Sequence, residues 1–273
     1  MNINLLIIDP QNDFCDLSTI NNNSIKEYPA LPIKGADNDM QRLSAFIDKN
    51  IKHISNIAIT LDTHHIIDIS LISFWETYDG KELKPFTLIN SESIKKNKII
   101  PKNHNFKQYA FNYIKNIEVL YKQGLIVWPI HCQIGSWGHN IHKDISKSCL
   151  KWEKTHIKNV EFFLKGLNPL TEQYSAVELT NNKNQIIKNN KILSFIKNSD
   201  KLIIAGEASS HCVKKTIEDL IKYLQPNDLK KIIVLSDCMS PVYGFADNTN
   251  NFFLCIEKEG IQISQSNKNI LCK

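Results

Sequence analysis

One of the seven cysteines in this chain stands where a thiol can become a nucleophile. Cys212 follows the segment from Gly206 to His211 and comes directly before an apolar stripe with helical spacing that starts at Val213. A thiol in the first turn of a helix lies at the positive end of the helix dipole, which lowers its pKa toward the thiolate. The preceding turn can offer backbone N–H groups to an oxyanion. Most cysteines are small buried hydrophobic residues, but the stripe already supplies the core face of this helix, so we interpret Cys212 as a nucleophile.

An acid and an amine also follow apolar runs of strand length. Asp9 comes directly after residues 6–8, and Lys165 comes after residues 162–164. Taken alone, Asp9 is more typical of a turn cap than of a catalytic base, and Lys165 is also typical of a lysine whose stem lies along an apolar surface. At strand ends that meet, Asp9 can serve as a general base and Lys165 as a cation that stabilises a thiolate.

A further group of residues has the types and spacing of metal ligands. Asp62 and His64 are two positions apart, so their side chains share one side of an extended segment, whereas His65 points the other way. His131, after Trp128, can supply a third ligand. One carboxylate and two imidazoles suit a divalent metal ion that keeps positions open for water or substrate. A polar turn and a structural histidine remain the ordinary alternatives.

Alternating strand-like and helix-like segments must position these side chains. Continuous apolar runs are typical of a parallel sheet that helices cover on both faces. The sequence therefore predicts an α/β fold, a doubly wound three-layer αβα domain with a mainly parallel sheet, whose strand ends gather the residues above. The predicted strands are residues 5–8, 57–61, 125–127, 160–164, 202–205 and 232–235, and the predicted helices cover residues 36–51, 113–121 (stopping at Gly124) and 213–224.

Two stretches interrupt this alternation. Residues 16–34 are polar and contain an asparagine tract at 21–23, and residues 66–105 mix prolines, aromatic and polar residues without sustained periodicity. We predict that both are loop insertions on a single domain that spans residues 1–273, and we interpret the second as a lid over the site.

Composition and charge exclude other classes of protein. The chain has 273 residues, of which 42% are hydrophobic and 22% charged, so it can build a sizeable core. Its net charge of +5 comes from scattered lysines without long runs of like charge. The seven cysteines include no CxxC pair, which indicates reduced thiols. The N-terminal apolar run is too short for a signal peptide or membrane span, so we expect a cytoplasmic protein that binds neither nucleic acid nor membrane.

These motifs, in this order, resemble those of the nicotinamidases in the isochorismatase-like superfamily. The match is spread across most of the chain, which makes it more specific than any single motif. Asp9-Pro10-Gln11-Asn12-Asp13-Phe14 is similar to the D-x-Q-N-D-F opening, Asp62-Thr63-His64 to the D-x-H metal pair, Trp128-Pro129-Ile130-His131-Cys132 to the W-P-x-H-C segment, Lys165-Gly166 to the catalytic Lys-Gly pair, and Ala205 to Val213 to the nucleophile turn.

The resemblance implies a metal-assisted cysteine hydrolase that converts nicotinamide and water to nicotinate and ammonia through a thioester. It also implies that the partner is a small-molecule amide and that the cofactor is a divalent ion, zinc or else manganese or iron. The bond between Glu207 and Ala208 is expected to be cis, and the resemblance is compatible with a homo-oligomer. The implied residues are Asp9, Lys165 and Cys212 for catalysis, Ala208 and Cys212 for the oxyanion hole, Phe14 and Trp128 for the substrate ring, and Asp62, His64 and His131 for the metal.

The sequence also departs from the nicotinamidase pattern. Nicotinamidases usually have another histidine shortly after D-x-H, where this chain has Asp68 and its neighbours, and the segment between His64 and His131 is unusually long. Two alternatives therefore stay open: an amidase of the same superfamily that acts on a larger or ureido-type amide, and a catalytically silent binding relative. A dinucleotide-binding dehydrogenase is excluded, because no glycine-rich fingerprint follows the first strand.

Overall fold

The apolar runs of the sequence build a central six-stranded sheet in which each strand is parallel to its neighbours. The computed structural model of the chain describes residues 1–22, 25–180 and 185–271. In the first strand Leu5 and Ile7 pack into one apolar cluster and Leu6 and Ile8 into another, so both faces are buried. In spatial order the strands are β14 (Gln262–Ser264), β13 (Ile232–Leu235), β12 (Lys201–Gly206), β1 (Ile3–Ile8), β4 (Asn56–Asp62) and β9 (Glu161–Lys165).

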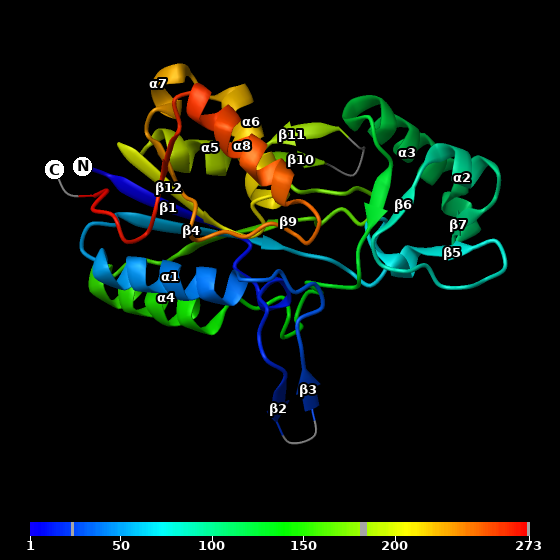
Figure 1. Cartoon of the computed structure of the whole chain (residues 1–273), viewed down its shortest axis with the longest axis horizontal. Coiled ribbons are helices and arrows are strands. Elements are labelled where there is room, and N and C mark those ends of the chain that lie inside the picture. The colour runs from blue at the N-terminus through cyan, green and yellow to red at the C-terminus, as the bar shows by residue number, and fades with distance from the viewer. Residues whose placement is uncertain (23–24, 181–184, 272–273) are drawn as a thin grey trace.

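Helices cover both faces of this sheet, which confirms the predicted three-layer αβα architecture (Figure 1). The face of Leu5 is covered by α1 (Ala36–Lys49) and α4 (Lys143–His156), whose buried side chains share its cluster. The opposite face is covered by α5 (Asn190–Lys197), α6 (Cys212–Tyr223), α7 (Pro226–Leu229) and α8 (Ala246–Lys258).

The predicted strand at residues 125–127 does not belong to this sheet, and that part of the prediction is wrong. The residues form a strand, β8 (Leu125–Val127), but it pairs antiparallel with β6 (Thr87–Ile89). A short apolar run specifies an extended segment without specifying its partner, and here the partner lies in a segment with no visible periodicity. The sheet instead gains β14 at its edge, which is too short and polar to stand out in the sequence.

Residues 66–105, expected to be a loop, contain regular structure and contribute to an apolar core of their own. Trp75 is fully buried, and its cluster extends into the helix that follows the segment. That helix ends at Tyr121, where Lys122 takes a left-handed conformation with φ 60°, ahead of the predicted stop at Gly124. Within residues 66–105, β5 (Trp75–Thr77) pairs antiparallel with β7 (Ile99–Pro101). The other elements are β6, α2 (Ser91–Lys95) and short 3₁₀ turns at Ile72–Phe74 and His104–Phe106, and the helix that follows is α3 (Lys107–Tyr121).

The start of this inserted segment is hydrogen-bonded to Trp128, which follows β8. The Trp128 N–H donates to the Ser70 carbonyl at 2.8 Å, and the Ile72 N–H donates to the Trp128 carbonyl at 3.0 Å. Trp128 also meets the ring of Phe86 here, at a centroid distance of 5.7 Å. The segment and α3 have further contacts with the loop after β9: the Ile69 N–H donates to the Pro169 carbonyl at 2.8 Å, and the Tyr109 hydroxyl donates to the Leu170 carbonyl at 2.8 Å.

The other insertion, residues 16–34, is also more ordered than a polar loop. It contains an antiparallel pair, β2 (Ile20–Asn22) and β3 (Ile25–Glu27), while Asn23 of the predicted asparagine tract lies outside the described residues. The chain then returns to the core through buried Leu31 and Ile33. A further antiparallel pair joins β10 (Glu178–Thr180) and β11 (Ile186–Lys188), and a 3₁₀ turn covers Asn12–Phe14. No helix within the described ranges has both the length and the apolar character needed to cross a bilayer.

Candidate active site

The carboxyl ends of neighbouring parallel strands bring the candidate side chains together. Asp9 follows β1 directly, Asp62 ends β4 and Lys165 ends β9, where Lys165 stands opposite Asp62 in the register. Cys212 is reached from β12 through a short turn and is the first residue of α6. The sheet thus collects residues that lie far apart in the sequence at a single edge.

Lys165 lies at the centre of this group. Its Nζ is 2.9 Å from Asp9 Oδ2, 2.9 Å from Asp62 Oδ1 and 3.4 Å from Cys212 Sγ. The side chain is 1% exposed, so its charge needs partners inside the protein. Burial lowers the pKa of Lys165, but the carboxylates of Asp62 and Asp9 outweigh burial and raise this pKa well above its ordinary value. Lys165 is therefore a permanent buried cation.

The two carboxylates beside Lys165 differ in basicity. Burial raises the pKa of Asp9 above its usual value, although Lys165 and a hydrogen bond from Thr60 oppose the rise. Burial acts on Asp62 in the same direction, but Lys165 and His64 outweigh it and hold the pKa of Asp62 well below its usual range. Asp9 is therefore the carboxylate that can accept a proton, while Asp62 stays ionised.

The Cys212 thiol is protonated in this environment, contrary to the expectation from its place in the helix. Burial raises the pKa of Cys212 well above its ordinary value; Lys165 opposes the rise, and Asp9 and Asp62 reinforce it. The Lys165 ammonium group contacts both this thiol and the Asp9 carboxylate. Its position at the start of α6 is as predicted, but the dipole does not dominate, and forming the thiolate requires a base. We call Asp9, Lys165 and Cys212 the thiol half of the site.

A second group, the metal half, consists of Asp62, His64 and His131, which could together hold a metal ion. One ligand atom from each lies within 4.8 Å of the others. Asp62 Oδ2 is 3.2 Å from His64 Nε2 and 3.5 Å from His131 Nε2. His65, by contrast, is exposed. A buried carboxylate with two converging imidazole nitrogens fits the donor set of zinc or a similar divalent ion.

Hydrogen bonds on the far side of each ring orient these histidines. His64 Nδ1 is 2.9 Å from Asp68 Oδ2, and His131 Nδ1 is 2.8 Å from the Pro129 carbonyl oxygen. Both partners are acceptors, so each ring has a proton on Nδ1, and Nε2 is the nitrogen that faces Asp62 and would bind a metal ion. Asp68, which stands where the sequence departed from the nicotinamidase pattern, is fully buried and accepts further hydrogen bonds from Ser70. Asp68 therefore fixes the ring orientation of His64, a candidate metal ligand, and its sequence position alone did not indicate this role.

A small cavity of about 30 Å³ opens beside Cys212, and Phe14 and Trp128 lie on its walls. Phe14 contacts the His131 ring at a centroid distance of 5.4 Å, while Trp128 meets the His211 ring edge-on at 5.2 Å. Residues 66–105 contribute no side chain to this lining, so the lid stays a prediction. The lining residues are Phe14, Leu31, Ile33, Asp62, Trp128, His131, Glu172, Tyr174, Ala208, His211, Cys212 and Val242.

Glu172, Tyr174 and His211 are pocket residues that the sequence reasoning missed. The indole N–H of Trp128 is 3.2 Å from both Glu172 Oε2 and the Tyr174 hydroxyl. Burial raises the pKa of Glu172 to about 7, and burial lowers the pKa of His211 to about 4, so His211 is neutral. Glu172 and Tyr174 lie in an irregular segment after β9, without a motif that could mark them. His211 did have a signal, since it stands next to the proposed nucleophile.

The turn before α6 contains a cis bond between Glu207 and Ala208, as expected. Within this turn the N–H groups of His211 and Val213 donate to the Ala208 carbonyl, and the Ser209 N–H donates to the Ser240 carbonyl. Among the contacts of the described residues, the N–H groups of Ala208 and Cys212 have no such partner. They are available to a ligand in the cavity.

The rest of the Asp9 motif fastens the strand ends together. The Gln11 amide donates to the Asp62 carbonyl at 2.8 Å and accepts from the Asp62 N–H at 2.7 Å. Asp13 accepts from the Cys132 N–H at 2.6 Å, and a Cβ at Gly138 would come within 2.0 Å of this Asp13 carboxylate. These polar residues hold the loops that carry both halves of the site.

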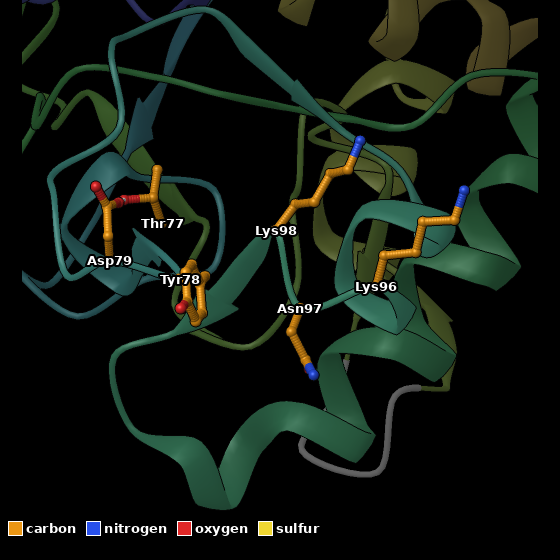
Figure 2. A pocket seen from close by; sticks show the side chains of 6 residues that line it. All are labelled: Thr77, Tyr78, Asp79, Lys96, Asn97 and Lys98. Atoms are coloured by element: carbon orange, nitrogen blue, oxygen red, sulfur yellow. The ribbon is translucent and has the colours of Figure 1, made fainter.

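A larger hollow, of about 480 Å³, lies on the inserted segment far from these groups in the sequence. Figure 2 shows the Lys96, Asn97 and Lys98 side chains on one side of it and Thr77, Tyr78 and Asp79 on the other. Tyr78 is 78% exposed, and Lys96 forms an ion pair with Glu92. These side chains are solvent-exposed and do not converge on a common point, so we place the chemistry at the sheet edge.

Comparison with known proteins identifies the fold. Neither a protein-family model nor a curated protein matches the sequence. Among solved structures, a nicotinamidase/pyrazinamidase from Acinetobacter baumanii has a TM-score of 0.62 at 17% identity, covering 97% of this chain and 96% of the other. The pyrazinamidase of Pyrococcus horikoshii in complex with zinc has a TM-score of 0.55 at 16% identity, covering 97% and 99%. An isochorismatase-like hydrolase from Alkaliphilus metalliredigens has a TM-score of 0.51 at 12% identity, covering 97% and 96%. The chain therefore has the isochorismatase-like fold.

Proposed function

We propose that this protein is a metal-assisted cysteine amidohydrolase and that nicotinamide is its substrate. The observation that carries the proposal is the position of Lys165 Nζ, within 2.9 Å of an acid that can accept a proton and 3.4 Å of a thiol that must lose one. The nicotinamidase/pyrazinamidase from Acinetobacter baumanii shares the fold over nearly its whole length, which supports an activity of this type.

In the proposed reaction, Asp9 takes the proton of Cys212, and Lys165 stabilises the thiolate that results. The sulfur attacks the carbonyl carbon of the amide, and the backbone N–H groups of Ala208 and Cys212 bind the oxyanion. Asp9 returns the proton to the departing ammonia, which leaves a thioester on Cys212. Asp9 then removes a proton from a water molecule that attacks the thioester, and the acid product leaves as the thiol re-forms.

The metal half would position the substrate for this attack. Asp62, His64 and His131 would hold a divalent ion, with zinc favoured by their donor set and by its presence in the Pyrococcus horikoshii pyrazinamidase. When bound, the ion would supply Lewis-acid charge that attracts a ring nitrogen of the substrate. Asp68 orients His64 for that purpose, and Asp62 balances the charge of Lys165 at the same time.

The walls of the cavity favour a small flat amide. Phe14 and Trp128 offer aromatic surface on which a planar ring can pack. The cavity volume of about 30 Å³ favours a compact amide over a bulky one.

A specific observation favours a second candidate, a ureido-type amide. The Glu172 carboxyl group lies on the cavity wall, where it can accept a hydrogen bond from a substrate N–H that nicotinamide lacks on its ring. A catalytically silent binding protein fits less well, because the thiol, the amine and the acid are buried in mutual contact, an arrangement that binding alone does not require.

Ammonia release by the zinc-loaded protein tests these candidates. We expect turnover of nicotinamide and pyrazinamide, with less turnover of ureido amides, and loss of activity after treatment with a chelator and recovery with zinc. Turnover of ureido amides alone would replace the substrate but keep the amidohydrolase, whereas no ammonia from any amide in the panel would refute the proposal.

A further inference from the structure

Two buried carboxyl groups adjoin the turn that carries Ala208 and Cys212, and the proposed reaction uses neither of them. Glu207 precedes Ala208 in this turn and is 0% exposed, while Asp39 lies on α1 and is 2% exposed. Ser240 binds both side chains, since its N–H donates to Glu207 Oε2 at 3.0 Å and its hydroxyl donates to Asp39 Oδ2. Two ionised carboxylates held side by side repel each other and can only accept hydrogen bonds, whereas a proton on one of them lets the two groups bind directly.

The other hydrogen bonds of the pair indicate which carboxyl holds the proton. Asp39 receives donors from the Arg42 guanidinium and from the Ser240 hydroxyl, which favour its ionised form. Glu207 Oε2 accepts from the Ser240 N–H at 3.0 Å, but Glu207 Oε1 is buried without a donor among the described residues. A proton on Glu207 that is donated to Asp39 gives the unpartnered Glu207 oxygen a hydrogen bond while Asp39 stays ionised.

Among the described residues, Arg42 is the cation that forms an ion pair with Asp39. The ionisable groups that surround it on α1 are Asp37 and Arg42, and on the loop after β1 they are Cys15 and Asp16. Near the end of β13 they are Asp237 and Cys238. Arg42 is the one cation of this set, and its side chain is 44% exposed, so it does not balance two buried anions.

We propose that Glu207 is a positioning residue that remains protonated and holds the oxyanion-hole turn against α1 through a proton shared with Asp39. The assignment rests on the proposed function for its catalytic consequence, although the contact itself does not. Ser240 completes the connection, because its N–H binds Glu207 while its hydroxyl binds Asp39. The turn is thereby tied both to α1 and to the loop after β13.

The connection is expected to fail at high pH. Burial and the neighbouring Asp39 raise the pKa of Glu207 well above its ordinary value. The folded chain thus keeps a proton that the unfolded chain has already released, so the free energy of unfolding falls as pH rises from the ordinary pKa of glutamate to the raised one. Once the proton is lost, two like charges face each other and the turn loses its support.

Replacement by glutamine and by alanine separates a shared proton from simple packing. Glu207→Gln keeps a donor toward Asp39 and an acceptor for Ser240, so we expect at least half of the wild-type kcat and a flatter decline of stability and kcat at alkaline pH. Glu207→Ala leaves Asp39 and the Ser240 N–H without this partner, and we expect kcat to fall about 100-fold with little change in KM, a loss typical of displaced catalytic groups. Glu257→Gln, at an exposed position on α8, serves as the matched control and should change neither kcat nor the alkaline decline of stability.

Two readouts do not depend on the substrate: the rate at which iodoacetamide alkylates Cys212, and the urea midpoint of unfolding, each followed from neutral to alkaline pH. If no amide is hydrolysed, the proposed function fails while these profiles still test the pair. A Glu207→Gln protein whose profiles match those of the wild type, or that loses as much kcat as Glu207→Ala, overturns the assignment. If Glu207→Ala does not fold, Glu207→Gln decides the question through the same profiles.

Discussion

The thiol half and the metal half of the site meet at Asp62 of the metal half but keep their geometry by different means. In the thiol half, the Lys165 ammonium group contacts an acid and the thiol directly, so charges inside the half hold it together. In the metal half, His64 and His131 are each fixed from outside, by a carboxylate or a backbone carbonyl. Asp62 gives one oxygen to each half.

This difference indicates how each half responds to damage. Removing a charge from the thiol half leaves other buried charges without a partner, which affects both stability and reactivity. Removing a support from the metal half only lets a ring rotate, so binding of the ion weakens while the charge balance around Lys165 persists. The predictions below test this distinction, beginning with the largest effect.

Replacing the nucleophile should have the largest effect. Cys212→Ala removes the sulfur that forms the thioester in the proposed reaction, so we expect ammonia release to fall by about 10⁴-fold or more. The loss is measured as kcat on nicotinamide with the zinc-loaded protein. Cys149→Ala, which removes a buried thiol on α4 outside the site, is the control and should retain activity. Turnover by the Cys212 variant would mean that this residue is not the nucleophile.

Replacing the central cation should damage both stability and reactivity. Lys165→Met keeps a similar volume but leaves Asp9 and Asp62 buried without their cation, which we expect to cost about 3–5 kcal/mol of unfolding free energy. Urea denaturation measures this loss, and iodoacetamide labelling of Cys212 should slow in parallel. Lys154→Met, at an exposed position on α4, provides the matched surface control. Unchanged stability would contradict a charge-held thiol half.

Loosening the metal half should affect binding of the ion and little else. Asp68→Ala removes the partner of His64 Nδ1, so we expect affinity for zinc to fall about 10–100-fold. Isothermal titration calorimetry gives the affinity, and the alkylation rate of Cys212 shows whether the thiol half has changed. If the rate of Cys212 alkylation falls by as large a factor as the affinity for zinc, then Asp68 also affects the thiol half, and the two halves are not independent.

The smallest effect is expected at Glu172, which belongs to neither half. Burial raises the pKa of Glu172 to about 7, so the folded chain holds a proton that the unfolded chain releases near its ordinary value. The free energy of unfolding should therefore decline as pH rises from the ordinary pKa of glutamate to about 7. Glu172→Gln should flatten the stability profile in that window and leave it unchanged above. A profile that is identical in both proteins would show that Glu172 titrates normally.

The sequence anticipated the main sheet and the residues at its edge for the same physical reason. Strands buried on both faces are continuous apolar runs, and parallel strands end at one edge, so a polar residue after each run falls near the others. This reasoning located Asp9, Asp62, Lys165 and Cys212. It does not extend to pairing partners, which is why β8 was wrongly placed in the central sheet.

Other features depend on information that local patterns do not contain. Glu172 and Tyr174 reach the cavity from an irregular segment, so neither periodicity nor a motif marks them. The protonation of Cys212 was misjudged because the start of a helix can be inferred from sequence, whereas the degree of burial and the neighbouring carboxylates cannot. The support of His64 by Asp68 likewise appears only when the chain is folded.

Ser70 and Ile72 are hydrogen-bonded to Trp128, so a change in the length of the chain between them adds little loop-closure entropy. This stretch reaches the cavity at two points: Trp128 lines it directly, and the N–H of Glu172, another lining residue, donates to the Tyr113 hydroxyl of α3 at 2.6 Å. A change in the stretch would therefore reshape the cavity wall at Trp128 and Glu172, while Asp9, Lys165 and Cys212 are held by the ends of the central strands and the start of α6.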